Sequence, residues 1–251
     1  MPLDVESVRK LRPQNPIYYF PTIGSTMTEA ARLAHEGAPH GAVVIADEQT
    51  AGLGRLGRQW ISEAEAGLYS STLLRLSLPL HQIPLISLLL ALATAHAIQE
   101  CVPLTCDLRW PNDVLIQERK VAGILPQLVD SCIVAGIGIN VNQTAFEPGL
   151  RTPATSLKIA LGGQDVRREI ILINLLEFID RFVSLLLQEG PQSILRAFTQ
   201  ASSYASNRKV LIEDSGATGI TAGLDENGFL LIRSETGKLE RVAAGSVRPA
   251  A

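Results

Sequence analysis

The chain has 251 residues, 46% of them hydrophobic, and this length fits one large domain, or one large and one small domain, around a sizeable core. A formal net charge of −3 gives no general electrostatic reason to expect nucleic-acid binding. The three cysteines, Cys101, Cys106 and Cys132, form neither a disulfide framework nor a zinc-binding spacing, which favours a reducing cytoplasm.

The first part of the chain alternates predicted strands with a helix and a loop. Residues 1–15 are polar and have no apolar h-region, so we expect no signal peptide. Short apolar runs predict strands at residues 17–20, 42–47 and 68–76. A helix is predicted over residues 27–36, because Thr26 and Glu29 form a capping-box pair at its start.

The most apolar stretch of the sequence covers residues 83–98. Pro84 and several polar residues interrupt it, so its apolar runs are far shorter than the about 20 residues that a membrane span needs. We therefore expect a buried core helix over residues 84–100 and no membrane partner.

The second part predicts a hairpin, two helices and a group of short strands. Strands are expected at residues 105–110, 114–117, 120–129 and 132–141, the last two as an antiparallel pair around a turn at Asp130-Ser131. Amphipathic helices are expected at residues 167–188 and 191–201. Four close strands follow, at residues 209–213, 220–224, 229–233 and 239–243. Their spacing is typical of a small β-barrel.

These elements predict an α+β protein in which helices pack on a mixed, largely antiparallel sheet. The change of pattern places a domain boundary near residue 205. We therefore expect a larger domain at residues 1–205 and a small β-barrel domain at residues 206–251.

Residues 49–60 form a glycine-rich, basic loop. Its glycines let the backbone approach a phosphate, and Arg55 and Arg58 offer planar forks for phosphate or carboxylate oxygens. Gly52, Gly54 and Gly57 also match the dinucleotide fingerprint G-x-G-x-x-G. That fingerprint needs a helix opening at the glycines, whereas this loop leads into a predicted strand. A mobile surface loop is the simpler alternative.

Three further segments carry polar residues at unusual places. Pro111 ends a strand, which puts Asn112 and Asp113 at a sheet edge; the alternative is an ordinary polar turn.

Lys120 enters an apolar strand beside Gly123, which makes sense if an anion lies over the glycine. The alternative is a hairpin corner with the ammonium group in water.

The third segment contains Gly136, Gly138 and Asn140. Two glycines on one face of a core strand leave room for a flat ligand, and Asn140 could then bind its polar edge. Tight sheet packing is the alternative.

Together these segments resemble one family, the biotin–protein ligases. That family carries G-S-T-N, G-R-G-R-x-G-R followed by a tryptophan, K-W-P-N-D, R-K-x-x-G-I-L and G-x-G-x-N segments, in this order. The matching segments here are residues 24–27, 52–60, 109–113, 119–125 and 136–140. The resemblance covers about residues 17–142, and its order and spacing make it specific.

The chain departs from the family pattern at three positions. Met27 replaces an asparagine, Leu53 replaces the first loop arginine, and Arg109 replaces a lysine. Members of the family that repress transcription carry an N-terminal helix-turn-helix domain. The sixteen residues before the first predicted strand cannot hold one, so we expect a short form without DNA as a partner.

The resemblance implies a class II aminoacyl-tRNA-synthetase-like catalytic domain with a small SH3-like β-barrel after it. It implies that ATP, with Mg²⁺, activates biotin to biotinyl-5′-AMP, and that biotin passes to a lysine of a biotin carboxyl carrier protein. A lipoate or octanoate ligase of the same fold and a biotin sensor without catalysis are the alternatives. A homodimer is an open alternative to a monomer.

The resemblance also implies roles for single residues. Lys120, Arg55 and Asp113 are the expected catalytic residues, with Lys120 bridging the biotin carboxylate and the α-phosphate. The residues expected at biotin are Ser25, Thr26, Gln49, Gly52, Arg55, Lys120 and Gly123. The residues expected at the nucleotide are Arg55, Arg58, Trp60, Asn112, Lys120 and Asn140. Asp113 would receive or orient the proton of the acceptor lysine, and metal ligands stay unassigned.

Overall fold

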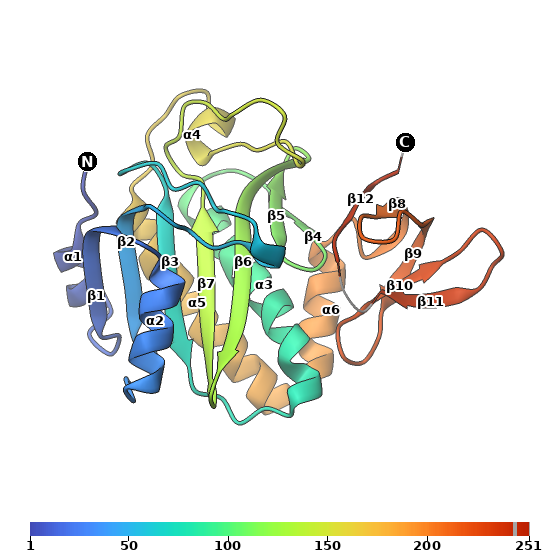
Figure 1. Ribbon diagram of the computed structural model, residues 1–251, viewed down its shortest axis with the longest axis horizontal. Coiled ribbons are helices and arrows are strands. Elements are labelled where there is room, and N and C mark those ends of the chain that lie inside the picture. The colour runs from blue at the N-terminus through green and yellow to red at the C-terminus, as the bar shows by residue number, and fades with distance from the viewer. Residues whose placement is uncertain (243–244, 251) are drawn as a thin grey trace.

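A mixed sheet forms the centre of the larger part of the molecule (Figure 1). The computed structural model describes residues 1–242 and 245–250, and within them seven strands join in the order β1-β2-β3-β7-β6-β5-β4. Strands β1 and β2 are parallel, and every other neighbouring pair of this sheet is antiparallel. The strands are β1 Ile17–Ile23, β2 Val43–Gln49, β3 Leu68–Leu74, β4 Asp107–Arg109, β5 Asp113–Ile116, β6 Arg119–Val129 and β7 Cys132–Ile139.

The hairpin of β6 and β7 sets the positions of Gly123, Gly136 and Gly138 on the sheet. Val129 pairs with Cys132 around Asp130-Ser131, as the sequence predicted. The register then places Gly123 opposite Gly138 and Leu125 opposite Gly136. Gly123 and Gly138 therefore lie side by side on neighbouring strands, where the sheet presents no side chains of its own.

Helices cover both faces of this sheet (Figure 1). Helix α2 (Thr26–His35) lies on one face, over the smaller apolar cluster that contains Met27, Leu33 and Val134. On the other face lie α3 (Ile83–Cys101), α5 (Arg168–Glu189) and α6 (Pro191–Ala201). In the described part, α3 alone has the length and composition of a membrane span, yet 67% of its most apolar window is buried in this core.

The C-terminal strands form a second sheet, which lies beside α6 and β4 (Figure 1). Within residues 206–242 and 245–250, five strands pair antiparallel in the order β11-β10-β9-β8-β12. They are β8 Ser206–Ile212, β9 Thr218–Leu224, β10 Leu230–Arg233, β11 Leu239–Val242 and β12 Val247–Pro249. Residue 243 of the predicted last strand lies outside the described residues.

Some local expectations were wrong. Ser25, not Thr26, is the N-cap of α2, because the Thr26 hydroxyl hydrogen-bonds to Gln49. The Glu29 carboxylate pairs instead with Arg32 at 2.6 Å. Short elements were also missed: α1 (Val5–Leu11), α4 (Leu157–Ala160) and β12. Each buries only one or two side chains, which is too few to establish a periodic pattern in the sequence.

Candidate functional site

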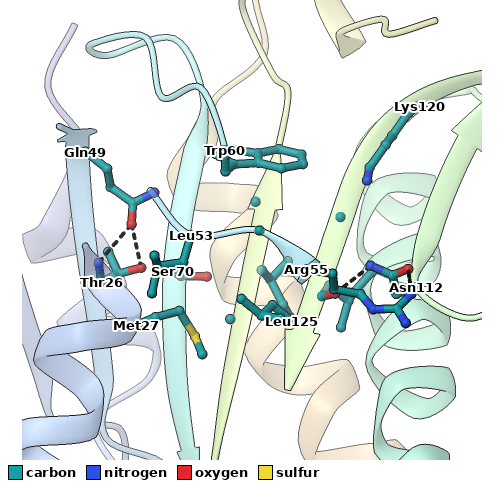
Figure 2. Close-up of a pocket in the computed structure, with 16 residues that line it drawn as sticks. Thr26, Met27, Gln49, Leu53, Arg55, Trp60, Ser70, Asn112, Lys120 and Leu125 are labelled. Atoms are coloured by element: carbon teal, nitrogen blue, oxygen red, sulfur yellow. Dashed lines mark hydrogen bonds between the residues drawn. The ribbon is translucent and has the colours of Figure 1, made fainter. Parts of the chain in front are cut away.

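A cavity of about 440 Å³, counted with its open mouth, lies on the sheet face where α2 begins (Figure 2). Residues from α2, the loop after β2, and strands β6 and β7 form its walls. The predicted site residues that line it are Thr26, Gln49, Arg55, Trp60, Asn112, Lys120 and Gly123. The fold thus brings the predicted motifs together around one space.

One wall of the cavity is a hydrogen-bonded network around the Gln49 side chain. Gln49 Oε1 accepts from the backbone amide of Thr26 at 2.8 Å and from its hydroxyl at 3.0 Å (Figure 2). Gln49 Nε2 donates to Ser62 Oγ at 2.9 Å, and Ser71 Oγ donates to Thr26 Oγ1 at 2.9 Å. This network holds the amide and the hydroxyl in fixed orientations, as recognition of a planar polar group requires.

Another part of the wall is apolar. Met27 is 4% exposed, and a Cβ on Gly136 would lie 2.4 Å from its sulfur, so the glycine makes room for this side chain. Leu125 and Leu53 line the same cavity. These three side chains were not among the predicted site residues, although all lie inside the motifs.

The indole of Trp60 lies over the glycine pair of the hairpin. A Cβ on Gly123 would be 2.7 Å from Trp60 Cζ3, and a Cβ on Gly138 would be 2.5 Å from Trp60 Cε2. Figure 2 shows the ring between the Gln49 and Lys120 side chains. The interpretation that the glycines leave room for a flat ligand therefore needs correction, because the protein's own tryptophan occupies that space.

Lys120 lies beside Gly123, as the sequence predicted, because a Cβ on this glycine would be 3.1 Å from Lys120 Nζ. The ammonium group is not free in water. Its Nζ lies 2.5 Å from Asp113 Oδ1, and Arg109 Nη2 lies 2.5 Å from Asp113 Oδ2. Burial by itself would raise the pKa of Asp113, but the two neighbouring cations and their hydrogen bonds hold that pKa below its ordinary value. Asp113 is therefore a carboxylate that orients Lys120.

The glycine-rich loop is folded into a compact hairpin rather than an open loop. Gly54 N donates to Arg58 O at 2.7 Å, and Trp60 N donates to Gly52 O at 2.9 Å. The tip is the three-residue 3-10 turn η1 (Arg55–Gly57), in which Gly57 has a φ of 71°. The chain then returns toward β3, so the helix that a dinucleotide fingerprint requires is replaced by this turn.

The two loop arginines have different surroundings. Arg55 Nη1 donates to Asn112 Oδ1 at 2.9 Å and to the carbonyl of Gly245, in the C-terminal part of the chain, at 3.2 Å. Asn112 Nδ2 in turn donates to Ile124 O at 2.8 Å, which ties the sheet edge to β6. Arg58 follows the tip of the loop and is exposed.

A second cavity, of about 770 Å³ with its open mouth, adjoins the first. Both cavities are lined by Trp60 and Lys120, so these two side chains stand at their junction. Arg58 and Asn140 line only the second cavity. Asn140 Nδ2 donates to Thr155 O at 3.1 Å and so fixes the segment that covers this cavity.

Two predicted biotin-site residues lie outside both cavity walls. Ser25 is buried, and its hydroxyl has no hydrogen-bond partner among the described residues. A Cβ on Gly52 would lie 2.5 Å from the carbonyl oxygen of Trp60, so this glycine allows the close approach of two loop segments. Within residues 1–242 and 245–250, no group of three or more His, Cys, Asp or Glu side chains is placed to hold a metal ion.

Known proteins share this sequence pattern and this fold. A sequence model of the biotin/lipoate A/B protein ligase family matches residues 19–143, and one of the biotin protein ligase C-terminal domain matches residues 205–248. The bifunctional ligase/repressor BirA of Bacillus subtilis is 34% identical over 228 residues, which is 88% of this chain and 70% of BirA. The chain belongs to the biotin–protein ligase family.

Two further members of the family support this assignment. The biotin--[acetyl-CoA-carboxylase] ligase of Mycobacterium tuberculosis is 33% identical over 232 residues, which is 89% of this chain and 85% of that protein. The structure of the biotin protein ligase from Aquifex aeolicus in complex with biotin and ATP matches with a TM-score of 0.82. It is 31% identical and covers 94% of this chain and 99% of its own.

The three departures from the family pattern all lie at or behind the first cavity. Met27 and Leu53 line it and make its wall more apolar than the family's asparagine and arginine would. Arg109 lies behind it, 6% exposed and paired with Asp113.

Proposed function

We propose that this chain activates biotin with ATP to give biotinyl-5′-AMP and then transfers biotin to one lysine of a biotin carboxyl carrier protein. Membership of the family supports this activity. The observation that carries the proposal is that two cavities adjoin at Lys120 and Trp60, so that two substrates can meet beside one ammonium group. The bound ligands named for the Aquifex aeolicus structure, biotin and ATP, would each occupy one of these cavities.

We assign the first cavity to biotin. Gln49 and Thr26 face it with a fixed amide and hydroxyl, which match the donors and acceptors of a ureido ring. Met27 and Leu125 offer apolar contact to the rest of the molecule. Ser25 and Gly52 line neither cavity. They would support the biotin site indirectly, Ser25 at the start of α2 and Gly52 by allowing the close approach of two loop segments.

We assign the second cavity to the nucleotide. Arg58 and Asn140 line it, and Trp60 offers an aromatic ring at its border with the biotin cavity. Phe146 adds a second aromatic side chain to this wall. Arg55 and Asn112 are hydrogen-bonded to each other and line the first cavity, from which they would hold phosphate oxygens that reach past Lys120.

The first chemical step joins two anions and therefore needs a cation between them. An oxygen of the biotin carboxylate attacks the α-phosphorus, and the bond to the leaving pyrophosphate breaks. Lys120 would stabilise the charge on both reacting groups, with the guanidinium of Arg55 beside it. The Asp113 carboxylate holds the Lys120 ammonium at the edge of the cavity in advance.

The second step transfers biotin to the carrier. The lone pair of the neutral acceptor amine attacks the carbonyl carbon of the mixed anhydride, and the bond to the phosphate oxygen breaks to release AMP. The proton that the amine nitrogen loses as the amide forms passes to water. Because the pKa of Asp113 is lowered and both its oxygens are paired, we assign this residue to orienting Lys120 rather than to accepting the proton.

The metal would enter with the nucleotide. Since the described residues form no cluster of metal-ligating side chains, we expect MgATP, with phosphate oxygens and water around the ion.

We also propose the domain architecture and the cellular location. These are a class II synthetase-like catalytic domain over residues 1–205, an SH3-like barrel over residues 206–251, and a cytoplasmic location. The antiparallel order of β8 to β12 supports the barrel. The possibility of a homodimer, and the absence of DNA and membrane partners, stay predictions.

The decisive experiment is incubation of the protein with biotin, MgATP and a biotin-accepting carrier domain, followed by an avidin blot. We expect biotinylation of one carrier lysine that requires all three components. Parallel reactions with lipoate and octanoate test the alternative acyl groups, with the mass of the carrier domain as the readout because avidin does not bind these acyl groups. Labelling by either acid at a rate equal to that of biotin would overturn the assignment of substrate.

A further inference from the structure

Three charged side chains form a buried row behind the junction of the two cavities. Arg109, Asp113 and Lys120 have side chains that are 6%, 10% and 24% exposed. Arg109 binds Asp113 Oδ2 and Lys120 binds Asp113 Oδ1, each at 2.5 Å. One carboxylate is therefore shared between two cations, and of the three side chains Lys120 is the most exposed.

The sheet register aligns this row with the substrate side. Arg109 pairs with Asp113 across β4 and β5, Asp113 pairs with Gly123 across β5 and β6, and Gly123 pairs with Gly138. Trp60 lies over the last two positions. Arg109 is thus fixed by the same strands that position the site.

Other contacts hold the guanidinium of Arg109 in place. Its Nη2 donates to Thr152 Oγ1 at 2.9 Å, and its Cζ lies 5.9 Å from the centre of the Tyr204 ring. Its Nε has no hydrogen-bond partner among the described residues. A buried ion pair with an unmet donor contributes little to stability, because desolvation offsets the Coulomb attraction. Stability alone therefore does not account for a buried arginine here.

Arg109 changes the net charge of the row. Asp113 and Lys120 alone would be neutral together, so the carboxylate would oppose the attraction of an incoming anion to Lys120. With Arg109 the row carries a net charge of +1, because one carboxylate stands against two cations. The charge of Lys120 then remains available to the cavity.

We propose that Arg109 is a positioning residue that neutralises Asp113, so that Lys120 is held in place by the carboxylate while its positive charge still serves the substrate anions. This inference rests on the proposed function, since the anions are the biotin carboxylate and the phosphates of ATP. Arg109 itself touches neither cavity; it acts through Asp113.

The test compares variants that separate charge from packing. Arg109→Met removes the charge and keeps most of the volume, and Arg109→Lys restores the charge. Arg109→Met combined with Asp113→Asn leaves Lys120 as the only charge of the row. Arg12→Met is the matched control, because Arg12 is also a nearly buried arginine paired with an aspartate, Asp180, away from both cavities.

Biotin-dependent ATP–pyrophosphate exchange gives kcat and the KM for ATP, and calorimetry gives the Kd for ATP. We expect Arg109→Met to lower kcat/KM by about tenfold or more, the size of one charge-assisted bond, while Arg109→Lys stays within about threefold of wild type. The double variant should be more active than Arg109→Met alone, and Arg12→Met should keep wild-type kinetics.

Equal losses in Arg109→Met and Arg109→Lys would show that shape matters rather than charge, and would overturn the inference. Wild-type kinetics and ATP affinity in folded Arg109→Met would overturn it as well. A wild-type chain that binds ATP but does not exchange pyrophosphate would contradict the proposed function instead. In that case the Kd values for ATP of the methionine and lysine variants still decide the role of Arg109.

Discussion

Lys120 has surroundings that determine what its charge can do. Its ammonium group is held by Asp113 at 2.5 Å and lies 5.4 Å from the centre of the Trp60 ring. Its side chain is 24% exposed, so an anion in either cavity can approach it without displacing the core. The lysine is therefore ordered before substrate arrives, which lowers the reorganisation needed during the reaction.

Lys120→Ala should abolish adenylate formation and leave the fold intact. The stabilisation lost when one transition-state donor is removed is about 3 to 4 kcal/mol in comparable sites. Asp113 keeps its partner Arg109, so the carboxylate is not left unpaired. Pyrophosphate exchange measures the step, and Lys238→Ala, at an exposed lysine, is the control. Exchange near the wild-type rate would exclude the role given to Lys120.

Leu53→Arg should keep ligation active and slow the release of biotinyl-AMP. Leu53 lines the first cavity and is 46% exposed, so an arginine there could turn toward phosphate or carboxylate oxygens without entering the core. A charge-assisted hydrogen bond is worth about 1.5 to 3 kcal/mol, or roughly tenfold or more in the dissociation rate.

The dissociation rates of the adenylate from the two proteins, at matched ionic strength, decide between two roles of position 53. Slower release supports a position that faces the anion. Faster release would mean that Leu53 is a packing residue and that arginine disorders the loop hairpin, in which position 53 forms a bridge with Gln59.

At the scale of elements, the site is a loop hairpin placed on a glycine-bearing strand hairpin. The loop of residues 49–62 brings Trp60 over β6 and β7, where Gly123 and Gly138 leave the sheet surface low enough for the ring. The same ring borders both cavities. The glycines therefore act on the substrates through the position of the tryptophan.

Gly138→Ala should displace the Trp60 ring and weaken substrate binding. The new Cβ would lie 2.5 Å from Cε2 of the ring, and overpacking of this kind costs about 1 to 3 kcal/mol. Titration calorimetry with biotin and with ATP measures the effect. In a Trp60→Ala background the same substitution should change affinity little, because its clash partner is gone. An equal loss in both backgrounds would mean that the glycine acts on the sheet itself.

The sequence predicted most strands and helices because their apolar residues follow a clear period, and it indicated which segments meet. It did not predict that Trp60 would occupy the space above Gly123 and Gly138, since that contact depends on how the loop folds back across the sheet. The pairing of Lys120 with Asp113 was also missed, because a β-bulge between β5 and β6 sets the distance between them.

At the scale of the whole molecule, the C-terminal sheet is fixed beside the site. Trp110 Nε1 donates to the carbonyl of Gly228 at 2.9 Å, and Arg55 donates to the carbonyl of Gly245. Val210 and Leu230 of this sheet belong to the same apolar cluster as α3 and α5. The second sheet therefore supports the segment at residues 109–113 and the loop arginine together. Strand β2, which ends at Gln49, lies on the side of the first sheet away from it (Figure 1).

Removal of residues 206–251 should leave biotin binding close to wild type and weaken the use of ATP. Thr26, Gln49 and Met27 stay in place, whereas Arg55 loses its bond to Gly245 and Trp110, only 4% exposed, loses its cover. Calorimetry with biotin and pyrophosphate exchange with varied ATP separate the two effects, with circular dichroism to confirm the fold. Loss of biotin binding in a folded truncated protein would contradict the prediction that residues 206–251 serve the use of ATP and not the binding of biotin.

Trp110→Phe tests the same coupling within the intact chain, because it removes the hydrogen bond to Gly228 and keeps the aromatic side chain. The lost bond should destabilise the protein by about 0.5 to 1.5 kcal/mol. If the C-terminal sheet supports the nucleotide side of the site, the KM for ATP rises in this variant while the Kd for biotin stays unchanged. An increase in the Kd for biotin with an unchanged KM for ATP would show that the sheet supports the first cavity instead.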